Sequence, residues 1–255
     1  MLTLPARRRP QRWLWGGLLL LGLGGAVLPQ AVPWLQRQEP PLPLAVLLPP
    51  ALAGLEEIDQ GSLLAGLAEA DAAWTPRMEL LADGRTRYHY KRRSGEPPLS
   101  LAAIRALMAN PPHFGPERSA IVELLAVLAR AGVRIQIAEP RKTGAAGEWD
   151  PAARSLRIKP GVVESGSIEF AKVLNHEAIH VAQSCSNGHV RARPRPLGIA
   201  DLMPADLEPV LQEPLYRFAG ALEQRLEREA YANQHNLGLG ADLVSRHCRL
   251  AAAPP

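Results

Sequence analysis

The sequence feature that most constrains the fold is a His-Glu-x-x-His pentapeptide at residues 176–180, inside an apolar stretch. On an α-helix, residues four apart lie on the same face, so His176 and His180 can direct both imidazoles to one point. Two imidazoles held in this way supply half of a tetrahedral zinc site. Glu177 lies about 100° further around the helix, beside a metal-bound water molecule, which is the position of a general base. The stretch therefore predicts a helix that carries a metal site inside a domain.

The residues around the pentapeptide favour a helix that begins near Ile168. Ser165-Gly166-Ser167 offers an N-cap, and Glu169 suits the positive end of the helix dipole. Apolar residues surround both histidines, namely Val173, Leu174, Ile179 and Val181. The pentapeptide also occurs by chance, so a buried helix whose histidines bind only backbone or carboxylate groups is the competing interpretation.

Composition and charge give no sign of nucleic-acid binding. The chain has 255 residues, of which 47% are hydrophobic, so it can bury a substantial core. Its formal net charge is +4, and the first twelve residues alone contain four arginines: Arg7, Arg8, Arg9 and Arg12. The remainder is close to neutral, so we expect no nucleic-acid partner.

Residues 1–30 are predicted to be a signal peptide or a membrane anchor. A basic segment, residues 7–12, precedes an uncharged run of sixteen residues, 13–28. This run is slightly short for a membrane span of about 20 residues, but residues 27–31 make a poor signal-peptidase site, so an uncleaved anchor is favoured. In both cases the remainder of the chain lies on the non-cytoplasmic side of the membrane. We therefore expect an exported or membrane-anchored protein.

Proline marks the start of the following domain. Residues 31–50 contain clustered prolines, which exclude a regular helix or a central strand, so this segment is expected to be a semi-rigid linker. Residues 51–255 form the expected domain. Its first predicted element is a hairpin over residues 77–90, which turns at Asp83-Gly84. Helices are predicted over residues 101–108 and 119–131, and strands over residues 133–138 and 155–159.

The segment between the two predicted strands is expected to be a loop, because glycine and proline interrupt it at Gly144, Gly147 and Pro151. The strands precede the metal helix in the chain. In this order of elements an edge strand can lie beside the metal, where it could accept a peptide by strand addition.

The third metal ligand must come from outside the pentapeptide, because His-Glu-x-x-His supplies only two. No third histidine follows at the short spacing of metzincins, since the next one is His189. Further along, residues 222–233 predict a helix with several carboxylates, in which Glu223 and Glu227 are one turn apart on one face.

Glu229 of the same helix is our predicted third ligand. It lies beside Ala230 and Ala232, whose small side chains would let this helix approach another closely. Asn233 follows four residues later on the same face, from which it could hydrogen-bond a metal-bound imidazole without touching the ion.

His176-Glu177-x-x-His180 followed by Glu229-x-x-x-Asn233 resembles the gluzincin group of zinc metallopeptidases, which are thermolysin-like in the broad sense. The resemblance covers residues 165–235 and assigns no subfamily. It implies an α+β fold, a zincin-like domain with a small twisted sheet packed on the metal helix. It further implies Zn²⁺ held by two histidines and Glu229, with Glu177 activating the zinc-bound water to hydrolyse a peptide or protein substrate. In that group an acidic residue often takes the place of Asn233 and orients the first histidine.

Two further sets of residues are candidates for roles near the metal. Hydrolysis requires a donor to the oxyanion, for which Tyr231 is our candidate, with Tyr216, His189 and His235 as alternatives. Cys185 follows the metal helix and Cys248 lies beyond the helix of Glu229. The two sulfurs could therefore form a disulfide if those helices meet.

Three classes of function are compatible with these features. The leading one is a zinc peptidase on the non-cytoplasmic side of the membrane. The alternative is a catalytically silent, zincin-like metal-binding or scaffolding protein of the cell envelope, against which the intact Glu177 argues. The third is an envelope structural protein without metal.

Overall fold

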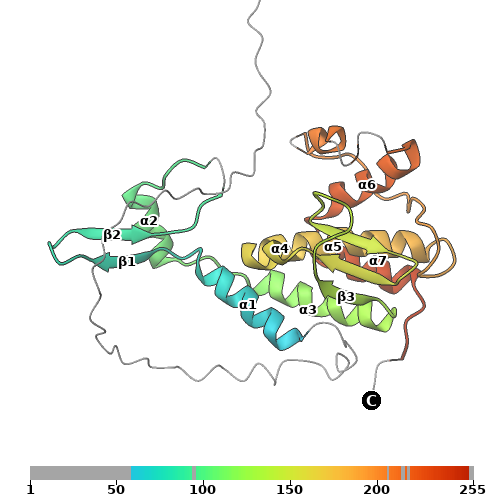
Figure 1. Cartoon of the computed structure of the whole chain (residues 1–255), viewed down its shortest axis with the longest axis horizontal. Coiled ribbons are helices and arrows are strands. Elements are labelled where there is room, and N and C mark those ends of the chain that lie inside the picture. The colour runs from blue at the N-terminus through green and yellow to red at the C-terminus, as the bar shows by residue number, and fades with distance from the viewer. Residues whose placement is uncertain (1–58, 94–95, 206, 214–215, 217–218, 253–255) are drawn as a thin grey trace, which may run out of the picture. The chain divides into compact units, whose positions relative to one another are not determined.

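The computed structural model describes residues 59–93, 96–205, 207–213, 216 and 219–252 (Figure 1). The expected targeting segment, residues 1–30, and the expected linker, residues 31–50, lie outside the described residues. Within the described part of the chain, no helix combines the length and the apolar character that a membrane span requires.

The described chain contains both helices and short strands, which confirms the mixed α+β class. The elements are α1 (Gln60–Ala72), β1 (Arg77–Leu80), β2 (Thr86–His89), α2 (Leu101–Ala109), α3 (Gly115–Arg130), β3 (Arg134–Ile137), β4 (Gly147–Asp150), β5 (Ser155–Ile158), α4 (Pro160–Ser165), α5 (Ser167–Cys185), the 3₁₀ helix η3 (Glu208–Gln212), α6 (Ala221–Asn233) and α7 (Leu239–His247). The strands β1 and β2 pair as the predicted hairpin, with Gly84 at a positive φ of 80° in its turn.

Three strands form a small sheet in the order β3-β5-β4, with β3 parallel and β4 antiparallel to β5. The prediction of a loop over β4 is wrong, because this segment pairs with β5 from Gly147 to Asp150. Trp149 of β4 is buried and donates a hydrogen bond from Nε1 to Ser184 Oγ of α5 at 2.9 Å. The edge strand β4 therefore lies against the helix that carries the His-Glu-x-x-His pentapeptide.

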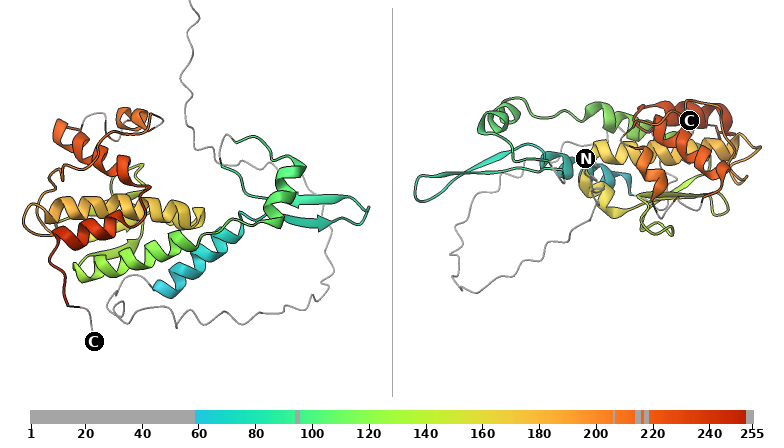
Figure 2. Two further views of the ribbon diagram at one scale, coloured as in Figure 1. Left: turned by 180° about the vertical axis from the view of Figure 1, so that it is seen from behind. Right: turned by 90° about the horizontal axis from the view of Figure 1, so that it is seen from above.

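The central element is α5, and it is buried along most of its length. Helices α3, α6 and α7 and strand β4 all contact it, and Figure 2 shows α3 and α7 alongside it. Its fully buried apolar side chains are Phe170, Leu174, Ala178, Ile179, Val181 and Ala182. Polar residues of α5 are buried together with these apolar ones, and they include His176 and Glu177 of the pentapeptide.

Helix α5 begins at Ser167, next to the predicted start, but its cap comes from another helix. Asp71 of α1 accepts hydrogen bonds from the backbone N of Ser167 at 2.7 Å and from its Oγ at 2.6 Å. Arg118 of α3 binds the same carboxylate at 2.8 Å. Gly166 has a φ of 101°, and a Cβ there would lie 2.6 Å from Asp71 Oδ1. The backbone N–H groups in the first turn of a helix have no partner within the helix, and Asp71 supplies an acceptor for one of them.

The other end of α5 is tied to the C-terminal part of the chain. A disulfide joins Cys185, the last residue of α5, to Cys248, which follows α7, with a Cα–Cα distance of 4.9 Å. The bridge closes a loop of 63 residues, which in the chain-entropy description stabilises the fold by about 4 kcal/mol.

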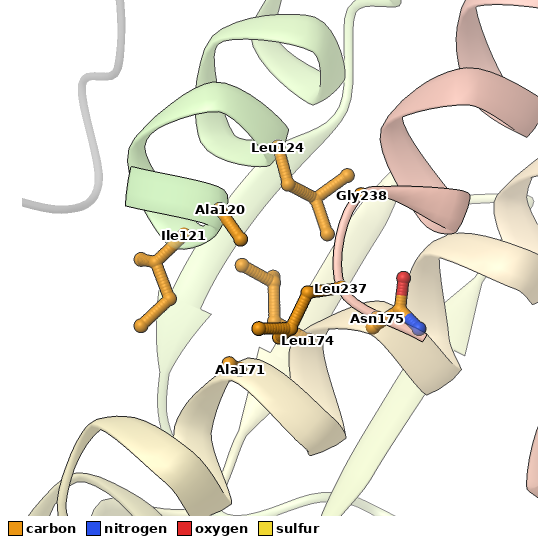
Figure 3. A pocket seen from close by; sticks show the side chains of 8 residues that line it. All are labelled: Ala120, Ile121, Leu124, Ala171, Leu174, Asn175, Leu237 and Gly238. Carbon is orange, nitrogen blue, oxygen red and sulfur yellow. The ribbon is translucent and has the colours of Figure 1, made fainter. Parts of the chain in front are cut away.

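Asn175, directly before the pentapeptide, connects α5 to both C-terminal helices. Its Nδ2 donates to the carbonyl oxygens of Asn233, Gln234 and Asn236 at 3.1–3.2 Å, at the end of α6 and in the turn that follows it. Its Oδ1 accepts from Gly240 N at 2.7 Å. Figure 3 shows Asn175 at the edge of a small, mostly apolar cavity of about 10 Å³ between α3 and α5. The cavity has room for about one water molecule.

We expect Asn175→Ala to lower the free energy of unfolding by about 3 kcal/mol, because a buried group left without its hydrogen-bond partner costs about 1–3 kcal/mol. Urea denaturation followed by circular dichroism measures this effect. Asn187→Ala is the matched control, since Asn187 donates one exposed hydrogen bond to Arg193 O. Equal losses in the two variants would contradict the connecting role of Asn175.

Candidate metal centre

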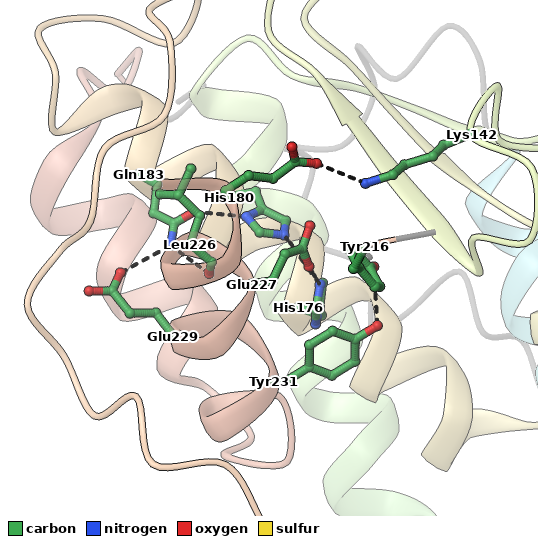
Figure 4. A network of polar contacts seen from close by, with 10 residues as sticks. Lys142, His176, His180, Gln183, Tyr216, Leu226, Glu227, Glu229 and Tyr231 are labelled. Carbon is green, nitrogen blue, oxygen red and sulfur yellow. Dashed lines mark hydrogen bonds and ion pairs between the residues drawn. The ribbon is translucent and has the colours of Figure 1, made fainter. Parts of the chain in front are cut away.

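Three side chains from two helices converge in the interior (Figure 4). His176 and His180 lie one turn apart on α5 with their Nε2 atoms 3.2 Å apart. Glu227 of α6 places Oε2 at 3.3 Å from His176 Nε2 and at 3.6 Å from His180 Nε2. The side chains of all three are at most 12% exposed. This buried cluster could hold a metal ion.

The spacing of the three atoms agrees with tetrahedral coordination. Ligand atoms about 2.0–2.2 Å from a tetrahedral Zn²⁺ lie about 3.3–3.5 Å from one another, close to the three observed separations. Glu227 Oε2 is buried, and among the described residues it has no hydrogen-bond partner. A buried carboxylate oxygen without a donor is costly, and a cation facing this oxygen and both imidazoles would satisfy it.

The prediction that Glu229 is the third ligand is wrong, because its carboxylate faces away from the histidine pair and is occupied by donors. Its Oε2 accepts from Leu197 N at 2.8 Å and from Gln183 Nε2 at 3.0 Å, and its Oε1 accepts from Gly198 N at 2.8 Å. Glu229 is fully buried, but its carboxylate binds Gln183 and the backbone of Leu197 and Gly198. The carboxylate that lies beside the two histidines belongs to Glu227.

The predicted hydrogen bond from Asn233 to a metal-bound imidazole is also not the one that the structure shows. Asn233 Nδ2 donates to the carbonyl oxygens of Ala200 and Glu229, both at 2.7 Å. The side chain therefore attaches the segment around Ala200 to the last turn of α6. The position four residues after the observed carboxylate, Glu227, holds Tyr231 instead.

Glu177 lies beside the cluster, in a space that strand β4 leaves open for it. A Cβ on Gly147 would lie 2.7 Å from both Cγ and Oε1 of Glu177 and 2.9 Å from Val173 Cγ1. Glycine is therefore required at position 147. Burial is the strongest influence on Glu177 and raises its pKa, against the opposite effect of the His176 charge. A carboxyl group with a raised pKa is a better proton acceptor near neutral pH.

Burial and charge act in opposite directions on the pKa values of His180 and Glu227. Burial lowers the pKa of His180, but the Glu227 carboxylate outweighs burial and raises this pKa to about 9. Burial raises the pKa of Glu227, but the charge of His180 outweighs it, together with His176, and holds the pKa well below its usual value. The centre therefore favours positive charge next to an ionised carboxylate.

Two tyrosines border the centre. The ring of Tyr231 packs edge-on against His176 with centroids 4.5 Å apart, and its hydroxyl lies 3.1 Å from that of Tyr216. Burial raises the pKa of Tyr231 to about 12, so it keeps its proton at neutral pH. Lys142 lies over the Tyr216 ring at 4.4 Å and forms an ion pair with Glu223 at 3.1 Å. Of the three alternative oxyanion donors, Tyr216 is buried, whereas His189 and His235 are exposed.

The sequence analysis did not predict three features of the centre. Glu227 was recognised only as a carboxylate on the same helix, and Gly147 only as a loop residue. Gln183 was not singled out, although it stands three residues after His180, a helical spacing that places the two on one face. Its Oε1 lies 2.7 Å from His180 Nδ1, and this spacing is the signal that could have revealed it.

No protein family, no curated protein and no solved structure matches this chain.

Proposed function

We propose that this protein is a zinc-dependent peptidase with a zincin-like architecture, related in its site to the gluzincins. The observation that carries the proposal is the convergence of His176, His180 and Glu227 at tetrahedral spacing, with Glu177 buried beside them. Neutral imidazoles and a carboxylate are the ligands of catalytic zinc sites that leave a fourth position open. A bound Zn²⁺ would act there as a Lewis acid on water and on a carbonyl oxygen.

The chain's own residues supply the proton transfers and the positioning. Glu177 accepts the proton of the attacking water and then donates it to the leaving amine. The protonated hydroxyl of Tyr231, or of its partner Tyr216, donates a hydrogen bond to the developing oxyanion. Strand β4, an edge of the sheet packed on α5, offers backbone groups to an extended peptide beside the centre.

The same proposal places the domain outside the cytoplasm. The Cys185–Cys248 disulfide supports this placement, because disulfides persist in oxidising compartments and are rare in the cytosol. The basic and apolar N-terminal residues 1–30 are proposed to direct or anchor the chain. Cell fractionation, with sequencing of the mature N-terminus, tests both statements, and a reduced cytosolic protein would contradict them.

Metal removal tests the proposed activity. We expect the purified protein to contain one Zn²⁺ per chain, to cleave peptides in a mixed peptide library, to lose cleavage on chelation and to recover it with added Zn²⁺. Elemental analysis and mass spectrometry of the library provide the measurements. A protein that binds zinc and cleaves no peptide would instead be the silent metal-binding protein, and one that binds no divalent metal would contradict the proposal entirely.

A further inference from the structure

The imidazole of His180 is the start of a chain of hydrogen bonds, and Figure 4 shows the part of it that runs through Gln183 to Glu229. Its Nδ1 lies 2.7 Å from Gln183 Oε1. The amide nitrogen of Gln183 donates to Leu226 O at 3.1 Å and to Glu229 Oε2 at 3.0 Å. The Glu229 carboxylate also accepts from the backbone N–H groups of Leu197 and Gly198, both at 2.8 Å.

The partners of Gln183 fix the orientation of its amide group. A carbonyl oxygen can only accept, so the group that faces Leu226 O must be the amide NH₂. Glu229 presents acceptor oxygens to the same NH₂ group. The oxygen of the amide must therefore face His180. Gln183 and Glu229 are both fully buried, so water does not compete for these bonds.

The fixed amide in turn fixes the proton of the imidazole. Gln183 Oε1 can only accept, so His180 Nδ1 must carry a hydrogen. A neutral imidazole has one N–H, which leaves the lone pair on Nε2, the atom that faces His176 and Glu227. This is the form in which histidine binds a metal.

We infer that Gln183 and Glu229 are positioning residues that hold His180 in its metal-binding tautomer and couple the metal centre to the backbone at Leu197 and Gly198. The inference rests on metal binding in the proposed function, but not on peptide hydrolysis. Groups that hydrogen-bond a metal-binding histidine in this way orient the ring and increase its basicity. This positioning role explains why Glu229 is buried although it is not a metal ligand.

The test is the zinc affinity of the metal-free full-length protein, measured by competition with a chromophoric chelator. Gln183→Met keeps the volume of the side chain and removes both ends of the relay, so we expect zinc binding to weaken by about 10–100-fold. Gln136→Met is the matched control. Gln136 accepts one hydrogen bond from Ser155 in the sheet, and its replacement should leave zinc affinity unchanged.

A substitution at the far end of the relay distinguishes positioning from general packing. Glu229→Gln keeps the size of the side chain and removes the charge that accepts from Gln183, Leu197 and Gly198. We expect this variant to weaken zinc binding in the same direction as Gln183→Met, but less strongly. Unfolding midpoints identify any variant that fails to fold.

A spectroscopic measurement on the unaltered protein tests the inference without any variant. Nitrogen-15 NMR of the zinc-loaded protein should show the His180 proton on Nδ1, protected from exchange with water. A proton on Nε2, an unprotected Nδ1 proton, or equal zinc affinity of Gln183→Met and the wild type would overturn the relay while leaving the metal centre intact. A wild-type protein that binds no zinc would overturn both, whereas zinc binding without hydrolysis would overturn only the peptidase proposal.

Discussion

Replacing Glu177 with glutamine is expected to reduce peptide hydrolysis by about 10²–10⁴-fold, the usual contribution of a positioned general base, while one Zn²⁺ per chain is retained. Glutamine has the shape of glutamate and fits beside Gly147, where the space is too small for a further Cβ. It cannot accept the proton of water at neutral pH. Because Glu177 is not among the three converging ligand atoms, the affinity for the metal should change little.

The measurement is the rate of cleavage of a library peptide at equal zinc occupancy, with zinc determined on the same samples. Glu169→Gln on the same helix is the matched control. Glu169 forms an ion pair with Lys172 in the first turn of α5, with a side chain that is 38% exposed, and such pairs contribute little. Unchanged cleavage by Glu177→Gln would rule out this residue as the base, and loss of zinc would mean that it supports the ion.

Local patterns in the sequence were sufficient for the elements on which the site is built. The helical spacing of His176 and His180 predicted both the helix and the convergence of their rings, and α5 begins one residue before the expected Ile168. The hairpin and the strands β3 and β5 were also predicted, because alternation and the Asp83-Gly84 turn are properties of adjacent residues. These features depend on residues that are close together in the sequence.

The features that were missed depend on contacts between elements far apart in the chain. The cap of α5 comes from Asp71, 96 residues before Ser167, so no pattern around Ser165-Gly166-Ser167 could reveal it. Strand β4 is stabilised by pairing with β5 and by the burial of Trp149 against α5. Its glycine, which predicted a loop, is instead required by the proximity of Glu177.

The choice between Glu227 and Glu229 illustrates the same limit within one helix. Leu226 and Ala230 are buried and define the face of α6 that packs inward. At about 100° per residue, the two glutamates project to opposite flanks of this face. One flank meets the histidines of α5 and the other meets the backbone at Leu197. Which flank faces the histidines is determined by how α6 crosses α5, and this packing is not encoded in the spacing of the residues.

Replacing Glu227 with glutamine is therefore expected to have the largest effect on metal binding of any single substitution at a glutamate. The binding free energy of zinc in small protein sites is about 10–16 kcal/mol, so the loss of one of three ligands is worth roughly 3–5 kcal/mol, or about 10³-fold in affinity. A neutral amide oxygen also leaves the ion without its charged partner. Competition with a chelator measures the affinity, and hydrolysis should fall with zinc occupancy.

Glu229→Gln is the comparison that decides between the two assignments. Its carboxylate binds Gln183 and two backbone N–H groups, so it acts on the metal only through His180, and we expect a loss of about 10-fold. A loss of about 10³-fold for Glu227→Gln with a much smaller loss for Glu229→Gln follows from the geometry, because only Glu227 Oε2 lies within 3.6 Å of both imidazole Nε2 atoms. The reverse order would restore Glu229 as the ligand and would require α6 to rotate by about half a turn relative to α5.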